Sequence, residues 1–328
     1  MTPKEIVQAT LDFAHPERVA HSFPESDLIW TRETAKTIST DWRKVDATRW
    51  ERTDEWGNTW ARIDPTSKGE VVQGVLDSLD SMDAMVFPDY SRTADFEQVR
   101  ADRAAHPHAW LIGSVPGFTF NVARKLRRID QYLMDILIEP EKIKTLHNRV
   151  DAVLEPLIRN YAAAGADSIM FPEDWGTQTA TFTGPDLWRE EFFPRTKKLC
   201  ALAHSLGLKV FMHSCGAIGE IIPGLCEAGI DALQFDQPEL HGFKNLAAYQ
   251  KNHQITFWSP VDIQKTLQTK NEAAIRQAAR DMLDTIWKGR GGFIAGFYGD
   301  NESIGLEQKW QEIASDEFLK WGTRQRYA

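Results

Sequence analysis

The segment GLKVFMHSCGAIGEIIPGLCEAGIDALQFDQ, residues 207–237, carries the repeating pattern that decides the fold. An apolar run at 208–213 is followed by a helix-like stretch at 218–228, and a second apolar run follows at 231–235. Glycine closes the helical stretch before each apolar run, as is common at helix ends. Strands that are apolar on both faces and alternate with helices are typical of a parallel sheet covered by helices on both sides.

The same alternation continues on both sides of this segment. We expect strands at 109–113, 167–171, 255–258 and 292–296, and helices at 119–137, 140–164, 185–206, 243–252 and 271–288, with a closing helix around 306–321. Five or six such units after residue 108 favour a closed α/β barrel over an open, doubly wound sheet, which is the alternative. We therefore predict a single (β/α)8 TIM-type barrel domain over residues 1–328, with an N-terminal extension. No G-x-G-x-x-G or Walker sequence follows a strand, so a nucleotide-binding function has no support.

The N-terminal third is less regular and rich in tryptophan. Its clearest element is WERTDEWGNTWARID, residues 50–64, which we predict to be a β-hairpin with Gly57 and Asn58 at its turn.

Composition narrows the classes of function. The chain has 328 residues, 42% of them hydrophobic, and a formal net charge of −9 without a dense basic tract. This charge argues against nucleic acid or an anionic membrane as a partner. The 3 cysteines form an odd set in a large chain, which suits thiols or metal ligands in a reducing compartment. We find no signal-peptide core and no run long enough to span a bilayer, and expect a cytoplasmic protein.

In a barrel, the active site forms where the carboxyl ends of the strands meet the following loops. The run at 208–213 ends in His213, and Cys215 follows two residues later. In an extended chain residues i and i+2 point to the same side, so imidazole and thiol are placed together. Such a pair suits Zn²⁺, which usually takes three protein ligands in catalytic sites. The alternative is a hydrogen-bonded histidine beside a small packing cysteine.

Other strand ends deliver more polar and aromatic groups to the same rim. Glu173 is our first choice for a third metal ligand, ahead of Asp174 and Asp262. We expect Asp236, Gln237 and Asp262 to orient substrate or to act as acid or base groups. The predicted substrate-binding residues are Asp174, Trp175, Gln178, Trp258, Gln264 and Tyr298.

Several segments together resemble the uroporphyrinogen decarboxylase superfamily, and within it the corrinoid-dependent methyltransferase-like members. They are ATLDFAHPERV (9–19), DEWGNTW (54–60), Pro140-Glu141 before a long helix, FPEDWGTQTATFTGPDLWREEFFPRTKKL (171–199), KVFMHSCGAIGEIIPGLCEAGIDALQFDQPE (209–239) and ITFWSPVDIQKTL (255–267). The resemblance covers nearly the whole chain and implies a (β/α)8 barrel with its site at the carboxyl-terminal mouth.

The resemblance separates two branches. The decarboxylases carry an N-terminal Arg-Gln-Ala-Gly-Arg-Tyr motif that holds substrate carboxylates, and this chain lacks it. The methylcobamide:thiol methyltransferases hold zinc with a His-x-Cys pair, which His213 and Cys215 match, and with a later cysteine. Here the corresponding stretch reads GFIAGFYGDNE (292–302), with Phe297 and Tyr298 near the expected position. Either an oxygen ligand has replaced the sulfur or the metal has been lost.

The resemblance thus implies a methyltransferase that moves a methyl group between a small-molecule donor and a corrinoid, or a thiol or folate acceptor, with zinc assistance. The chain has no Asp-x-His-x-x-Gly corrinoid motif, so a separate corrinoid protein would be its partner. One alternative is a lyase acting on a carboxylated aromatic or porphyrin substrate, for which Arg18, Arg124 and Arg195 are candidate carboxylate ligands. Another is a non-catalytic binding relative. The oligomeric state is open, a homodimer included.

Overall fold

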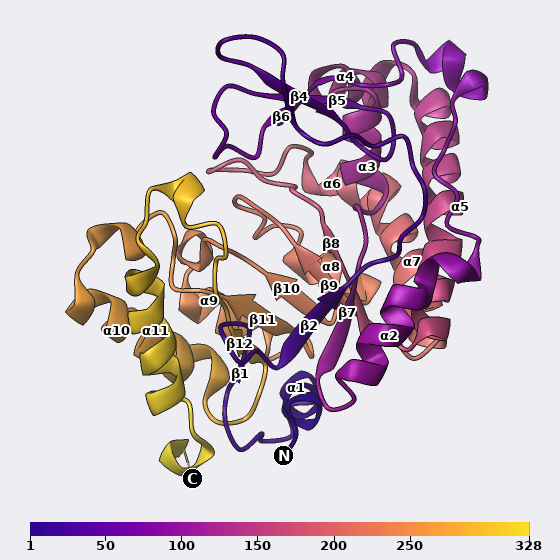
Figure 1. Cartoon of the computed structure of the whole chain (residues 1–328). Helices are drawn as coiled ribbons and strands as arrows, with labels where there is room; N and C mark the ends of the chain where they lie inside the picture. Colours follow the sequence, from indigo (N-terminus) through magenta and orange to yellow (C-terminus); the bar gives the residue numbers. More distant parts are fainter. Residues whose placement is uncertain (328) are drawn as a thin grey trace.

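Eight parallel strands form a nearly closed barrel surrounded by helices in the computed structural model, which describes residues 1–327 (Figure 1). Around the barrel the order is β1-β12-β11-β10-β9-β8-β7-β2. The strands are β1 (Ala20–His21), β2 (Leu28–Thr31), β7 (Trp110–Ser114), β8 (Ser168–Pro172), β9 (Lys209–His213), β10 (Ala232–Gln234), β11 (Thr256–Ser259) and β12 (Phe293–Ala295). This arrangement confirms the predicted (β/α)8 barrel.

The helices cover the outside of the barrel or close its ends. They are α1 (Pro3–Leu11), α2 (Glu97–Ala105), α3 (Thr119–Leu126), α4 (Ile129–Ile138), α5 (Pro140–Ala164), α6 (Pro185–Leu187), α7 (Phe193–Ser205), α8 (Ile222–Ala228), α9 (Phe243–Tyr249), α10 (Glu272–Met282) and α11 (Gln308–Trp321). Short 3-10 turns lie at Leu79–Ala84, Thr93–Phe96, Pro238–Leu240, Leu267–Thr269, Glu302–Ile304 and Arg324–Tyr327. No helix in residues 1–327 combines the length and the apolar character needed to cross a membrane.

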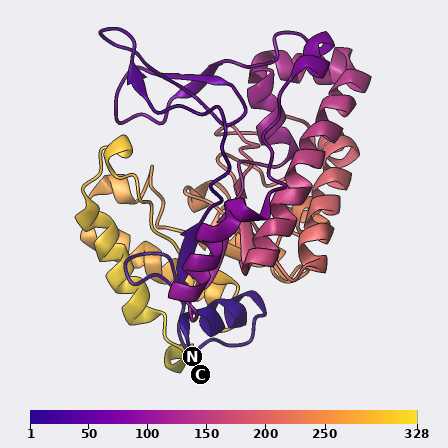
Figure 2. The ribbon, with the colours of Figure 1, turned by 45° about the vertical axis from the view of Figure 1, so that its right-hand side comes forward.

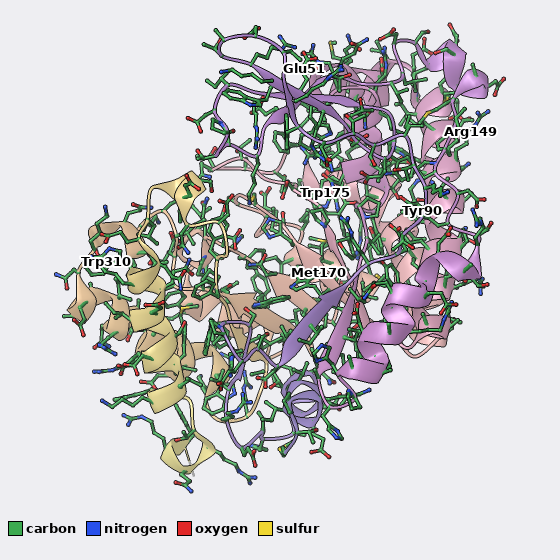
Figure 3. The ribbon with its side chains drawn as sticks, viewed as in Figure 1. Glu51, Tyr90, Arg149, Met170, Trp175 and Trp310 are labelled. Atoms are coloured by element: carbon green, nitrogen blue, oxygen red, sulfur yellow. The ribbon has the colours of Figure 1, made fainter. Side chains whose placement is uncertain are left out.

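Two hydrophobic layers follow from the alternation of side chains along the strands. One layer fills the barrel interior, where Ile112, Met170, Phe211 and Ile294 meet, and residues of α1 close its amino-terminal end. The larger layer lies between the strands and the surrounding helices. Figure 3 shows Met170 near the centre of the barrel. Because both faces of most of the strands are buried, these strands read as apolar runs, whereas Trp30 of β2 is exposed.

The barrel has a seam between β1 and β2, which form no ladder with each other in the described residues. The side chain of Asp27, which is fully buried, takes the place of a neighbouring strand. Its Oδ2 accepts a hydrogen bond from the His21 amide at 2.9 Å, and Arg18 donates to both of its oxygens at 2.6 and 2.7 Å. The seam is therefore closed by a side chain rather than by a ladder.

A second, small antiparallel sheet has the strand order β3-β4-β5-β6. It lies apart from the barrel strands, at the top of the view in Figures 1 and 2. Its strands are β3 (Arg43–Lys44), β4 (Trp50–Thr53), β5 (Thr59–Arg62) and β6 (Glu70–Gln73). The predicted hairpin is β4 and β5. Asp54 fixes its turn, because Oδ1 accepts hydrogen bonds from the amides of Trp56 and Asn58 at 3.0 and 2.9 Å.

Four predicted helices differ from the observed ones. The helix expected at 119–137 is divided into α3 and α4 because Arg128 adopts a positive φ of 61°. The helix expected at 185–206 contains a π-helical turn, η3 (Trp188–Phe192), and α10 likewise runs into a π-helical turn, η6 (Leu283–Trp287). The helix expected at 218–228 begins only at Ile222. A hydrophobic period places such helices but not their interruptions.

Candidate active site

A cavity of about 370 Å³ opens at the carboxyl-terminal ends of the barrel strands. Aromatic and polar side chains line it in similar measure. They are Ser22, Trp30, Lys68, Ser114, Met170, Phe171, Pro172, His213, Gln234, Asp236, Trp258, Phe297, Tyr298 and Gly299. The cavity has the size and mixed lining of a small-molecule site.

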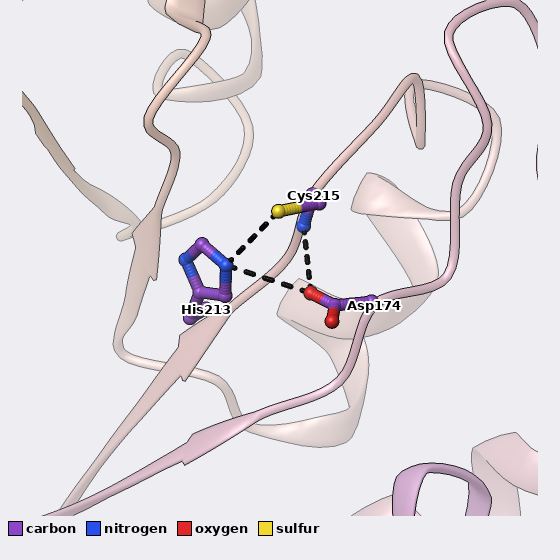
Figure 4. Close-up of side chains that lie close together, drawn as sticks. All are labelled: Asp174, His213 and Cys215. Atoms are coloured by element: carbon purple, nitrogen blue, oxygen red, sulfur yellow. Dashed lines mark hydrogen bonds and ion pairs between the residues drawn. The ribbon is translucent and has the colours of Figure 1, made fainter. Parts of the chain in front are cut away.

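Asp174, His213 and Cys215 form a compact group beside this cavity, which we call the donor cluster (Figure 4). One possible ligand atom from each residue lies within 4.8 Å of the other two. His213 Nε2 is 3.3 Å from Cys215 Sγ and 3.5 Å from Asp174 Oδ1. Asp174 Oδ1 also accepts a hydrogen bond from the Cys215 amide at 3.0 Å. Nitrogen, oxygen and sulfur donors thus converge on one point.

Surrounding side chains hold the donor cluster in place. His213 Nδ1 donates a hydrogen bond to Gln234 Oε1, so Nε2 is the ring nitrogen that faces Cys215 and Asp174. The amide of Gln234 in turn donates to Asp236 Oδ1 at 2.8 Å. On the other side, Arg124 Nη2 lies 3.2 Å from Asp174 Oδ2. Such outer contacts fix the orientation of ligating histidines in metal sites.

The electrostatics of the donor cluster are those of an anionic pocket. Burial lowers the pKa of His213, but its hydrogen bond to Cys215 and the charges of Asp236 and Asp174 outweigh that effect and raise the pKa to about 10. Burial raises the pKa of Asp174, but His213 and Arg124 outweigh it and lower the pKa below its ordinary value. Negative groups therefore surround Nε2, an environment that favours a positive charge there.

The donor set fits a divalent metal such as Zn²⁺. Zinc sites use imidazole nitrogen, thiolate sulfur and carboxylate oxygen, and catalytic sites combine three such ligands with an open position. Asp174, His213 and Cys215 supply one ligand of each kind, and His213 borders the cavity. The third donor, Asp174, follows β8, whereas the resemblance leads one to expect a second sulfur after β12, near Phe297 and Tyr298.

Glu173, which we predicted as the third ligand, lies elsewhere. Its side chain is 2% exposed, and its Oε2 accepts a hydrogen bond from the amide of Asn121, in the first turn of α3, at 3.0 Å. Burial raises the pKa of Glu173 to about 8, although Arg124 and the Asn121 hydrogen bond lower it. Adjacent residues at the end of a strand point in opposite directions, so Asp174 reaches His213 and Glu173 does not. This corrects the predicted ligand set.

Three of the other predicted residues line the cavity, namely Asp236, Trp258 and Tyr298. Trp258 Nε1 donates a hydrogen bond to Ser22 Oγ at 3.1 Å, and its ring lies 6.1 Å from that of Trp30. Gln237 and Asp236 border a separate hollow of about 10 Å³ beside Cys215. That volume suits a single water molecule.

The remaining predicted residues do not line the cavity. Asp262 is 1% exposed, and its carboxylate accepts hydrogen bonds from the amides of Glu239, Gln264 and Lys265, so it shapes a loop. Trp175 packs on Phe120 with ring centroids 3.8 Å apart and belongs to the outer hydrophobic layer. Figure 3 shows it between the barrel and the small sheet. Gln178 and Gln264 are exposed on loops. The structure therefore places none of these four side chains in the cavity lining, and their predicted roles stay predictions.

Sequence reasoning missed Trp30 and Lys68, which come from β2 and from the loop between β5 and β6. The signal for Trp30 was present, because LIWT is an apolar run followed by charged residues. Lys68 carries no such signal, since only the folding of the small sheet brings it to the cavity.

The three arginines named for a lyase are all engaged by carboxylates of the chain itself. Arg18 pairs with Asp27 at 2.6 Å and Arg124 with Asp174 at 3.2 Å. Arg195 pairs with Asp151 at 2.9 Å and with Glu191 at 2.7 Å. Their guanidinium groups are therefore committed to the fold and to the donor cluster.

The fold and the site at its mouth define a (β/α)8 barrel protein with a small-molecule cavity. The model of the family described as uroporphyrinogen decarboxylase (URO-D) matches residues 96–297, more than half of the chain. The chain therefore belongs to the uroporphyrinogen decarboxylase family.

Comparison with solved structures gives the following matches. A methyltransferase from Methanosarcina mazei superposes with a TM-score of 0.60 at 12% identity, covering 98% of this chain and 86% of that chain. A D-psicose 3-epimerase matches with a TM-score of 0.41 at 11% identity, covering 70% of this chain and 85% of that chain. At 12% identity the likeness to the methyltransferase shows the fold alone. No curated protein sequence matches this chain.

Proposed function

We propose that this protein is a methyltransferase that moves a methyl group between a small-molecule donor and a corrinoid carried by a separate protein, or a thiol or folate acceptor. The single observation that carries the proposal is the donor cluster beside the cavity, with one nitrogen, one oxygen and one sulfur ligand. Asp174, His213 and Cys215 would hold zinc. The family and the fold of the Methanosarcina mazei methyltransferase support this reading.

Bound zinc would supply a Lewis acid for the atom that bears the methyl group, or hold an acceptor thiol as thiolate. The chain's own residues do the rest. Gln234 holds His213 with Nε2 toward the donor cluster. Asp236 borders the cavity and can take up or return a proton at its carboxylate. Trp30, Trp258 and Tyr298 wall the cavity, exclude water and orient a small substrate.

The two alternatives receive less support. A lyase would need free cationic groups for substrate carboxylates. Arg18, Arg124 and Arg195 are paired internally, and of the cavity-lining residues only Lys68 is a cation of this kind. A closed mouth, or side chains of His213 and Cys215 that point away from each other, would favour the non-catalytic alternative. Instead the mouth holds a cavity of about 370 Å³, and the two side chains are 3.3 Å apart.

Metal analysis and a methyl-transfer assay test the proposal together. Protein purified without chelator should contain about one zinc per chain, and it should transfer methyl from free methylcobalamin to a member of a thiol and folate panel, or in the reverse direction from a methylated donor to cobalamin. Chelation should abolish transfer, and added zinc should restore it. Gln178→Ala, a change on an exposed loop, is the matched control. Zinc-free protein with no transfer in either direction contradicts the proposal.

A further inference from the structure

One face of the small sheet alternates cations and indole rings. In the antiparallel register Arg52 lies opposite Trp60, and Trp50 lies opposite both Arg62 and Lys44. Directly opposed residues share a face of the sheet, so these five side chains stand together. The acidic residue of β4, Glu51, lies on the other face, because neighbouring residues alternate.

Stacking fixes the arginines of this face. The guanidinium carbon of Arg52 lies 5.3 Å from the ring centroid of Trp42 and 4.8 Å from that of Trp60. Arg62 lies 4.4 Å from the ring of Trp42. These distances are those of cation–π contacts. Trp60 is held in turn by a hydrogen bond from its Nε1 to Asp54 Oδ2 at 2.7 Å. We call Trp42, Arg52, Trp60 and Arg62 the cation–indole face.

The charges of this face are not neutralised by the chain. Within residues 1–327 neither arginine has a carboxylate within the 4.0 Å that defines an ion pair, whereas the nearby Arg49 pairs with Glu51 at 2.8 Å. The Nε atoms of Arg52 and Arg62 are shielded from solvent and have no hydrogen-bond partner. Arg62 Nη1 donates a hydrogen bond to the carbonyl of Ser67 at 3.3 Å. The remaining Nη groups of the two stacked guanidiniums match the oxygens of a phosphate or carboxylate.

The cation–indole face lines a groove of about 580 Å³ that adjoins the cavity. Lys68 borders both spaces and adds a third positive charge. Asp300 and Glu302 line the groove as well. Their charges repel an anion, so its favourable position is next to the small sheet and away from these two acids. The net charge of −9 for the whole chain disfavours a long polyanion, but a small ligand responds to the local field.

We propose that the cation–indole face binds an anionic group attached to a flat ring, such as the phosphate and base of a nucleotide-like molecule or tail. The arginine Nη groups bind the anion, and the flat ring packs on the partly exposed surface of Trp42 and Trp60 that the guanidinium groups leave uncovered. Because Lys68 connects the groove with the cavity, a ligand that reacts in the cavity can rest such a tail on this face. The binding itself does not depend on the proposed methyl transfer.

Calorimetric titration at low ionic strength with three probes tests the proposal. The probes are 5′-AMP, adenosine, which lacks the charge, and inorganic phosphate, which lacks the ring. We expect 5′-AMP to bind at least tenfold more tightly than either of the others. Arg52→Gln with Arg62→Gln should weaken 5′-AMP binding at least tenfold, whereas Arg49→Gln, which removes a paired charge from the same sheet, should change it less than twofold.

A second variant leaves the sheet untouched. Asp300→Asn with Glu302→Gln removes repulsion across the groove and should tighten 5′-AMP binding severalfold. Thermal unfolding confirms that each variant is folded. The proposal is overturned by equal affinity for adenosine and 5′-AMP, by no measurable binding of 5′-AMP, or by 5′-AMP binding that the folded arginine variants leave unchanged. None of these readouts requires zinc or methyl transfer, so the proposed function is tested separately.

Discussion

The donor cluster and the cation–indole face lie on the barrel and on the small sheet, and they are built in opposite ways. The donor cluster sits at the ends of β8 and β9, whose ladder sets Pro172 against His213, and negative groups surround its histidine. The cation–indole face is positive and depends on stacking between side chains. The comparison teaches that one part of the mouth suits a metal ion, and the other suits an anion.

The largest effect is expected from the donor cluster itself. His213→Ala or Cys215→Ala should weaken zinc binding by about a hundredfold or more, because zinc sites derive roughly 10–16 kcal/mol from about four ligands. Arg62→Gln on the cation–indole face should change zinc affinity less than twofold. Competition titration with a chromogenic chelator measures both values. Similar losses in the two regions would show that the division between them is wrong.

The neighbouring carboxylates Glu173 and Asp174 sharpen the comparison within the barrel. Asp174→Asn removes the charge of a proposed ligand and should weaken zinc binding by roughly 10- to 100-fold. Glu173→Gln preserves an acceptor for the Asn121 amide and should change zinc affinity less than threefold. The same chelator titration serves both variants. A larger loss for Glu173→Gln would restore the ligand set predicted from the sequence.

A smaller effect is expected at Gln234, which contacts His213 and Asp236 but is not a ligand. Gln234→Ala frees the imidazole to rotate and should weaken zinc binding by about tenfold, the low end for outer-shell residues. Gln234→Glu keeps an acceptor for Nδ1 and should recover most of that loss. If the alanine variant binds zinc normally, strand geometry alone holds His213.

The last prediction concerns stability, a different quantity from zinc affinity, and its dependence on Glu173. Its folded-state pKa of about 8 lies above its ordinary value of 4.5, so the folded chain binds more protons between these limits. Stability should fall as the pH rises from about 4.5 to about 8, by at most about 1.4 kcal/mol per pH unit from this group. Glu173→Gln should remove that part of the slope. Urea unfolding from pH 5 to 9 measures it, and parallel curves for the two proteins would refute the assignment.

The barrel was predictable because its signals are local. Glycine follows the helical stretches, as at Gly165 and Gly229, and marks the helix ends. The structure places a left-handed residue at both positions. The pairing of His213 with Cys215 followed from the period of an extended chain. The sequence could not decide whether Glu173 or Asp174 faces His213, because this depends on the direction in which the chain leaves β8.

The rest of the site depends on contacts between distant segments. Lys68 and Trp30 reach the cavity from the N-terminal third, where short strands leave weak periodic signals. Asp262 and Trp175 follow strands, as functional residues do, but their side chains turn into a loop and into the outer hydrophobic layer. Position at a strand end therefore predicts the neighbourhood of a site but not which side chains enter it.

The seam between β1 and β2 gives the mouth unequal stiffness. Ser22 and Trp30, which line the cavity, lie on either side of it. Asp27 joins the two edges through its side chain and through its backbone amide, which donates to the carbonyl of His21 at 3.0 Å. A change in the spacing of these edges breaks no strand ladder, whereas His213 cannot shift without disturbing the pairing of β9 with β8 and β10. The compliant side of the cavity can thus adapt to ligands of different width while the donor cluster keeps its dimensions.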